Sequence, residues 1–98
     1  MIYKKLFEPL RIKGLTVKNR IVMPPMHNNL GNMEEGLTDR AIDFFAARAK
    51  GGFGMIGIGV IDTYFVPGAS SPHAFYLMND RHVEQHRRVV KEVRKYGA

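Results

Sequence analysis

The chain has 98 residues, of which 45% are hydrophobic and 24% charged, and its formal net charge is +6. This composition is typical of one small globular domain and excludes a disordered tail. The absence of cysteine excludes disulfide frameworks, thiol chemistry and cysteine-ligated metal or iron–sulfur sites within the chain. No apolar run approaches the ~18 residues that cross a bilayer, and residues 1–5 lead into no apolar segment. We therefore expect no membrane span, no secretory signal and a cytoplasmic location.

The basic residues gather at the two ends of the chain. Residues 1–20 hold six Lys or Arg and one Glu, and residues 81–96 hold six Lys or Arg and two Glu. Such a surface could bind nucleic acid or an acidic partner, or it could simply be a solvated helix face. No aromatic residue is interleaved to stack bases, which favours the solvated face. The residues concerned on the predicted C-terminal helix are Arg87, Lys91, Arg94 and Lys95.

The first third of the chain predicts a hairpin, a short strand and a loop. Residues 10–19 alternate apolar and basic residues around Gly14, which is typical of a small β-hairpin with one solvated face. Residues 20–26 form a short apolar strand that ends at two prolines, because proline cannot donate to a β-ladder. Residues 27–37 are polar and contain glycine, so they predict a loop.

A helix and a buried strand follow. Thr38 can cap the helix, and Gly51 and Gly52 end it. Residues 55–63 are apolar on both faces, as buried parallel strands are. The helical positions expected to face inward are Ile42, Phe45, Ala46 and Ala49.

Residues 64–79 predict a long loop, and a second helix begins after it. Asp80 can cap this helix, and Gly97 ends it. The residues expected to face inward are Val83, Val90 and Val93. Strands that alternate with helices of this length indicate β–α units in a parallel sheet. Two strands and two helices do not close a core, so we expect a part of something longer; the rival reading is a small basic α/β binding module.

Residues 52–57 match the pattern G-x-G-x-x-G. The dinucleotide-binding form of this pattern follows a strand and opens a helix, so that phosphate meets the helix N-terminus. Here the glycines follow a helix and open a strand. The pattern therefore favours a helix end followed by glycines that let a strand pack closely.

Four histidines are candidate site residues. His82 and His86 are four residues apart on a predicted helix, but no third ligand is near, so exposed helix histidines are favoured over a metal pair. His73 lies in a loop without context. His27 directly follows the first strand, and Asp62 lies at the end of the second. In (β/α)₈ barrels this edge carries the catalytic loops, although Asp62 could instead cap a helix or pair with an arginine.

Two stretches carry a family resemblance. The segment LFEPL at residues 6–10, followed by GLTVKNRIVM at residues 14–23, resembles the N-terminal signature of the old yellow enzyme family of FMN-dependent oxidoreductases. The likeness continues through FFAARAKGG at residues 44–52 and covers essentially the whole chain. Met26 and His27 resemble the 2,4-dienoyl-CoA reductase and 2-enoate reductase branch; other branches commonly have Thr or Cys where His27 stands.

The resemblance implies an α/β fold, namely the N-terminal hairpin and the first two β–α units of a TIM (β/α)₈ barrel. Within a 1–98 domain it places a hairpin lid at 10–19, one β–α unit at 20–52 and a second at 53–98. It implies FMN at the barrel mouth and hydride transfer from NAD(P)H, through flavin N5, to an activated carbon–carbon double bond. The substrate implied is a small enoate or enoyl thioester, in a homo-oligomer that binds neither nucleic acid nor membrane.

The same resemblance assigns site residues. Pro24, Pro25 and Met26 match the segment along the flavin ring, and His27, the candidate catalytic residue, matches the position beside the ring's carbonyl and N5 edge. Gly59 and Val60 match the positions below the ring. The family's substrate-activating histidines, proton donor, phosphate-binding residues and, in one branch, iron–sulfur cysteines lie on later strands. We therefore expect no metal site here and an inactive 98-residue chain.

Overall fold

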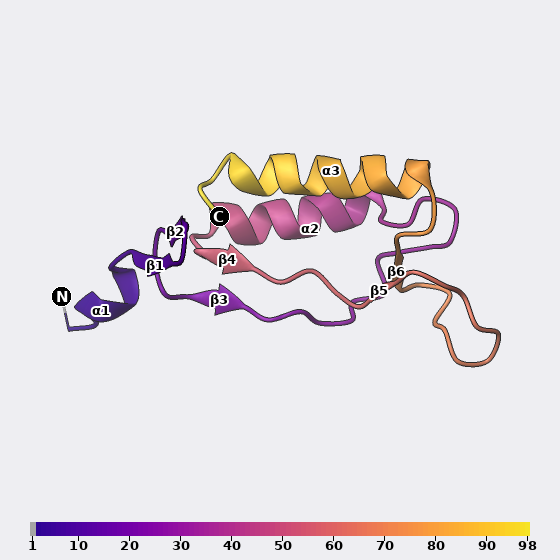
Figure 1. Cartoon of the computed structure of the whole chain (residues 1–98), viewed down its shortest axis with the longest axis horizontal. Coiled ribbons are helices and arrows are strands. Elements are labelled where there is room, and N and C mark those ends of the chain that lie inside the picture. Colours follow the sequence, from indigo (N-terminus) through magenta and orange to yellow (C-terminus); the bar gives the residue numbers. More distant parts are fainter. Residues whose placement is uncertain (1) are drawn as a thin grey trace.

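Two helices pack side by side above a layer of extended chain in this computed structural model, which describes residues 2–98 (Figure 1). Met1, the first residue of the predicted 1–98 domain, lies outside the described residues. The molecule measures 50 × 26 × 24 Å, because the N-terminal elements project beyond the helices. In chain order the elements are α1 (Lys4–Phe7), β1 (Leu10–Ile12), β2 (Leu15–Val17), β3 (Val22–Met23), α2 (Asp39–Lys50), β4 (Met55–Ile56), β5 (Ile61–Asp62), β6 (Phe75–Tyr76) and α3 (Asp80–Arg94).

The predicted hairpin is confirmed. β1 and β2 pair antiparallel, with Leu10 opposite Val17, and the turn places Lys13 at φ 53°. Beyond the hairpin, the buried Asn19 side chain donates to the Gly52 carbonyl at 2.8 Å and accepts from the Ile21 amide at 3.1 Å. This side chain therefore fastens the hairpin to the turn that leads from α2 into β4.

The parallel β–α–β arrangement is also confirmed, but its strands are shorter than predicted. β3 and β4 pair parallel, with Met23 opposite Ile56, and α2 connects them. The strand predicted over residues 20–26 reduces to β3, and the strand predicted over residues 55–63 divides into β4 and β5. The cause is the proline pair after β3, which offers no backbone donors to continue the ladder.

The segment predicted as a loop over residues 64–79 contains a buried strand. β6 pairs parallel with β5, with Ile61 opposite Phe75. Ala74, Phe75 and Tyr76 are at most 3% exposed and form part of the core. The prediction was wrong here because a two-residue strand among prolines and serines has no periodicity of its own. Hydrogen bonds and packing with residues distant in sequence set its place.

Helix α2 begins and ends where the sequence predicts. The Thr38 hydroxyl accepts from the Ala41 amide at 3.2 Å, and the helix ends at Gly51. The residues that it buries are Ala41, Ile42, Phe45 and Ala49. Ala46, which was predicted to face inward, is only partly buried.

Helix α3 departs from prediction at its cap and at its inward face. Asn79, not Asp80, caps it, because its side chain accepts from the His82 amide at 3.0 Å. The buried residues are His82 and Val89, whereas Val83 and Val90 are 40% and 43% exposed. Val93 is partly buried against the core. The buried His82 and Val89 each precede a predicted inward valine by one residue, which is about 100° around the helix axis.

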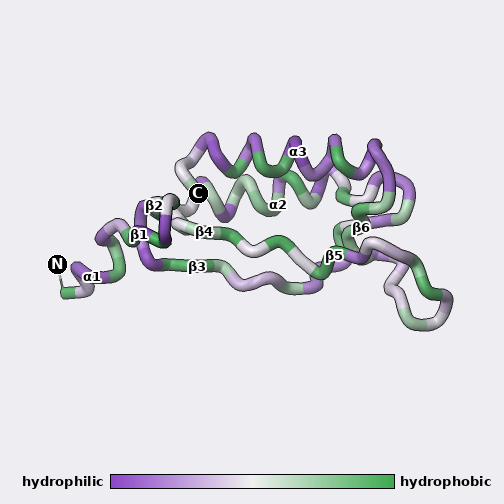
Figure 2. Tube along the Cα trace, viewed as in Figure 1, coloured by the Kyte–Doolittle hydropathy of each residue, from purple (hydrophilic) through white to green (hydrophobic). Residues whose placement is uncertain are grey.

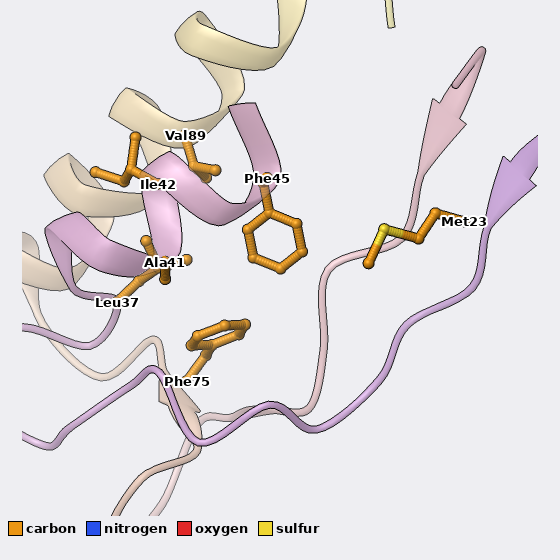
Figure 3. Packing of buried hydrophobic residues seen from close by; sticks show 7 residues of the cluster. All are labelled: Met23, Leu37, Ala41, Ile42, Phe45, Phe75 and Val89. Atoms are coloured by element: carbon orange, nitrogen blue, oxygen red, sulfur yellow. The ribbon is translucent and has the colours of Figure 1, made fainter. Parts of the chain in front are cut away.

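The core lies between the two helices and the extended layer. Figure 3 shows Phe45 of α2 and Phe75 of β6 pointing toward each other, with Met23 of β3 reaching toward both. The two rings meet edge to face with centroids 5.8 Å apart. Figure 2 shows hydrophobic residues along β3 and β4 and a mostly hydrophilic α3. Within residues 2–98 no helix is long and apolar enough to cross a membrane.

Two glycines with nearly equal backbone angles test how tightly this fold is packed. Gly36 (φ 76°) has no room for a Cβ beside the Tyr76 carbonyl and the His82 ring, whereas Gly68 (φ 79°) has open space. Both alanine variants cost the ~1–2 kcal/mol of a left-handed residue. We expect Gly36→Ala to lose a further ~1–3 kcal/mol from overpacking. Urea unfolding of both variants measures the difference, and equal losses would contradict this packing.

Candidate functional site

The candidate site lies where the chain leaves β3 and β4 and the two segments run side by side (Figure 1). The Gly57 amide donates to the Met23 carbonyl at 2.8 Å. A Cβ on Gly57 would stand 2.7 Å from Pro25 Cδ, and one on Gly59 would stand 3.0 Å from Pro25 Cβ. The two glycines therefore let the second segment lie directly against Pro25. Within the glycine pattern at 52–57, Gly57 packs against Pro25 and Gly54 against Asn19, as the sequence favoured, whereas Gly52 follows the helix end in open space.

The six predicted ring-contact residues lie on these two segments. Pro24, Pro25, Met26 and His27 are exposed on the first segment. On the second, Gly59 is buried and Val60 is 50% exposed. Met26 is 51% exposed, so the surface offers half-exposed apolar side chains from both segments. None of the six carries a fixed positive charge.

His27 has a defined partner. Its Nε2 lies 2.6 Å from Asn29 Oδ1, and because an amide oxygen only accepts, Nε2 carries the hydrogen. Asn29 adopts φ 59°, and the neighbouring Asn28 side chain accepts from the Leu30 amide at 3.1 Å. Asparagine is common in turns, because its side chain bonds to nearby backbone groups and it tolerates positive φ. Both serve in the turn, and Asn29 also holds the imidazole.

The loop after β3 is bound to the segment before α3. The Gly31 amide donates to the His73 carbonyl at 3.0 Å, and the Tyr76 amide donates to the Gly36 carbonyl at 2.9 Å. His73, which the sequence placed in a loop without context, contributes its backbone here. The two loops at this edge of the fold therefore form one unit.

Asp62 and Tyr76 lie next to this unit. The Asp62 carbonyl accepts from the Leu77 amide at 2.9 Å, and within residues 2–98 its carboxylate joins no ion pair with arginine. Tyr76 is fully buried and its hydroxyl donates to the Ser71 carbonyl. Burial, and secondarily the Asp62 charge, raise the pKa of Tyr76 above its ordinary value. The phenol therefore stays neutral and acts as a donor that fixes the 64–73 loop.

Contrary to the prediction, neither of the two helix histidines is exposed. His82 is fully buried, with Nδ1 accepting from the Met78 amide at 3.0 Å and Nε2 2.8 Å from the Met33 carbonyl. His86 is half-buried, and its Nε2 lies 3.1 Å from the Tyr76 carbonyl. Both rings are occupied by backbone groups. No cluster of three or more potential metal ligands occurs in the described part of the chain.

Ion pairs occupy much of the basic helix face. Arg87 pairs with Glu84, and Lys95 pairs with Glu92 at 2.7 Å. Arg88 pairs with Asp39 of α2 at 2.7 Å, and the hydrogen bond from that guanidinium holds the pKa of Asp39 below its ordinary value. These pairs are exposed and make small contributions to stability.

Comparison with known proteins points to a single family. Residues 5–98 match the NADH:flavin oxidoreductase / NADH oxidase family. The chain is 34% identical to an NADH oxidase of Thermoanaerobacter brockii over 96 residues, which is 98% of this chain and 15% of that protein. It is 42% identical to a cinnamate reductase of Clostridium sporogenes over 59 residues, which is 59% of this chain and 9% of that protein.

Comparison with solved structures points to the same family. The crystal structure of Old Yellow Enzyme from Pichia sp. AKU4542 superposes with a TM-score of 0.79 at 26% identity, covering 95% of this chain and 24% of that one. The prediction of an α/β hairpin plus β–α units of that barrel is therefore confirmed. The chain spans between about a tenth and a quarter of the length of these proteins.

His86 on α3 leads us to expect that the stability of the fold depends on pH. Burial lowers the pKa of His86 below its ordinary value of 6.5, against a smaller opposite effect of the Tyr76 carbonyl. The unfolded chain therefore binds more protons just below pH 6.5, so stability from this group is present above that pH and is lost as the pH falls.

We expect the free energy of unfolding to decline as the pH falls from 7 through the window below 6.5. His86→Gln, which keeps a donor for Tyr76, flattens that decline, whereas the control His73→Gln in the exposed loop does not. Urea titrations at several pH values measure this. A decline of unchanged steepness in His86→Gln would contradict the assignment.

Proposed function

Because the chain belongs to the NADH:flavin oxidoreductase / NADH oxidase family, we propose that it forms part of an FMN site in an oxidoreductase. The proposed reaction moves hydride from NADH or NADPH, by way of the flavin, to an activated carbon–carbon double bond of an enoate or enoyl thioester. The observation that carries the proposal is the contact of Pro25 with Gly57 and Gly59, which holds the two segments against each other. FMN supplies the reversible hydride acceptor for this chemistry.

The residues present fit the ring of the flavin. An isoalloxazine has apolar faces and one edge of carbonyl and nitrogen acceptors, and a protein binds it by a flat surface with donors at that edge. Met26 and Val60 offer half-exposed apolar area, and the two prolines make the first segment stiff. His27 carries its hydrogen on Nε2, which is the donor that an acceptor edge requires.

The same residues do not fit the phosphate of FMN. Pro24, Pro25, Met26, His27, Gly59 and Val60 include no lysine or arginine, and a phosphate dianion needs charged or multiple backbone donors. In the proposed function these six residues orient the ring, and phosphate-binding groups stand elsewhere. The chain alone therefore contacts the ring weakly and does not retain FMN.

His27 has two partners available in this proposal. Nε2 donates its hydrogen bond to Asn29 in the structure, and His27 would donate the same hydrogen bond to a carbonyl or nitrogen of a bound flavin ring. The imidazole then stabilises negative charge on the ring edge, which favours the reduced flavin. Similarity to a cinnamate reductase supports the enoate substrate class.

Titration with FMN and with lumiflavin, which has the ring but no ribityl phosphate, tests the proposal. We expect both to bind weakly and with equal affinity, to shift the NMR signals of residues 24–27 and 59–60, and to elute apart from the protein on gel filtration. His27→Ala weakens both about fivefold, which corresponds to the ~1 kcal/mol of one net hydrogen bond. His73→Ala, a control on the exposed loop, leaves both unchanged.

Two results would contradict the proposal. Flavin-induced shifts confined to residues outside these two segments would show that the ring binds elsewhere. Much tighter binding of FMN than of lumiflavin would show that the chain holds a phosphate site that its six residues do not provide.

A further inference from the structure

A buried imidazole outside the candidate site connects two distant parts of the chain. His82, in the first turn of α3, is 0% exposed. Its Nδ1 lies 3.0 Å from the Met78 amide, which only donates, and its Nε2 lies 2.8 Å from the Met33 carbonyl, which only accepts. The Asn79 side-chain nitrogen lies farther from Nε2, at 3.4 Å, so the two shorter contacts assign the hydrogen to Nε2.

The two partners belong to different loops. Met33 lies in the loop that follows β3, and Met78 immediately precedes α3. The ring fits closely, because a Cβ on Gly36 would stand 2.7 Å from His82 Cγ. The imidazole therefore links the start of α3 by hydrogen bonds to the middle of the β3–α2 loop, 49 residues away in sequence; we call this link the tie.

Separate local hydrogen bonds stabilise the turns along the chain between Met33 and His27. The Asn32 side chain accepts from the Glu35 amide at 2.7 Å and closes the turn that contains Met33. Thr38 Oγ1 donates to the Leu30 carbonyl at 2.5 Å, and the Leu30 amide donates to Asn28 Oδ1 at 3.1 Å. A further bond joins Asn29 to His27 Nε2.

We propose that His82 is a positioning residue for the candidate site. By donating from Nε2 to the Met33 carbonyl, it holds the loop in the conformation that places Asn29 against His27. The effect of this tie on a bound flavin rests on the function proposed above. The positioning of His27 does not, and it is measured without any flavin.

Two substitutions, to Gln and to Asn, distinguish the effect of the hydrogen bond to Met33 from the effect of filling the buried site with any polar side chain. A Gln side chain extends to the place of Nε2, so His82→Gln keeps a donor for Met33. An Asn side chain ends at the place of Nδ1, so His82→Asn keeps an acceptor for Met78 and loses the Met33 bond. Both variants replace the ring with the same chemical group at the same position.

Histidine ring signals in proton–nitrogen NMR spectra of the 98-residue chain provide the test. In the unmodified chain we expect His82 as the Nε2–H tautomer and His27 with a hydrogen-bonded Nε2–H. His82→Asn loses the hydrogen-bonded His27 signal and shifts the amides of residues 29–33, whereas His82→Gln retains both. The control His86→Gln, which alters the neighbouring ring bonded to Tyr76, leaves His27 unchanged.

Three outcomes would overturn the proposal: an Nδ1–H tautomer for His82 in the unmodified chain, a His27 signal that neither variant changes, or equal changes in both. If His82→Asn does not fold, the proposal is still tested by two results: the tautomer of His82 in the unmodified chain and the His27 signal of His82→Gln. If the His27 signals behave as expected and flavin nevertheless fails to bind, the positioning role stands and the proposed function fails.

Discussion

The absence of side chains at Gly57 and Gly59 is the constraint on which the rest of this structure depends. Because the second segment lies directly on Pro25, the ends of β3 and β4 continue as a joined surface although the ladder between them has stopped. Any larger residue at Gly57 would meet the backbone nitrogen of Pro25. The same contact sets how far apart the two following loops begin, and so it brings the loop after β3 within reach of β6.

Those loops, rather than the short strands, carry the long-range order of the fold. Gly31, Gly36 and Met33 of the first loop bond respectively to His73, Tyr76 and His82 of the second half of the chain. Each bond satisfies a backbone group that the two-residue strands leave without a ladder partner. These bonds give the irregular segments defined partners, and the proposed binding of a flat ring depends on such support.

The sequence predicted what local chemistry determines. The Gly14 hairpin, the Thr38 cap and the stop at Gly51 each depend on a few adjacent residues, and all are found. Strand β6 and the burial of His82 were not predicted because they depend on partners far along the chain. The inward face of α3 was predicted wrongly because the His82 ring is buried there while Val83 and Val90 are exposed. The residues of the candidate site came from a family resemblance, whereas the hydrogen bond between His27 and Asn29 is seen only in the structure.

The central claim, that the segments after β3 and β4 are joined through Pro25, can be measured directly because the chain has no cysteine. A Cβ at position 59 would lie 3.0 Å from that of Pro25, close to the ~3.5–4.5 Å between Cβ atoms in a disulfide. The double variant Pro25→Cys, Gly59→Cys should therefore form an intramolecular disulfide nearly completely under mild oxidation, and Pro25→Cys with Gly14→Cys should not. A folded Pro25→Cys, Gly59→Cys variant that stays reduced, or that links only between molecules, would contradict the account.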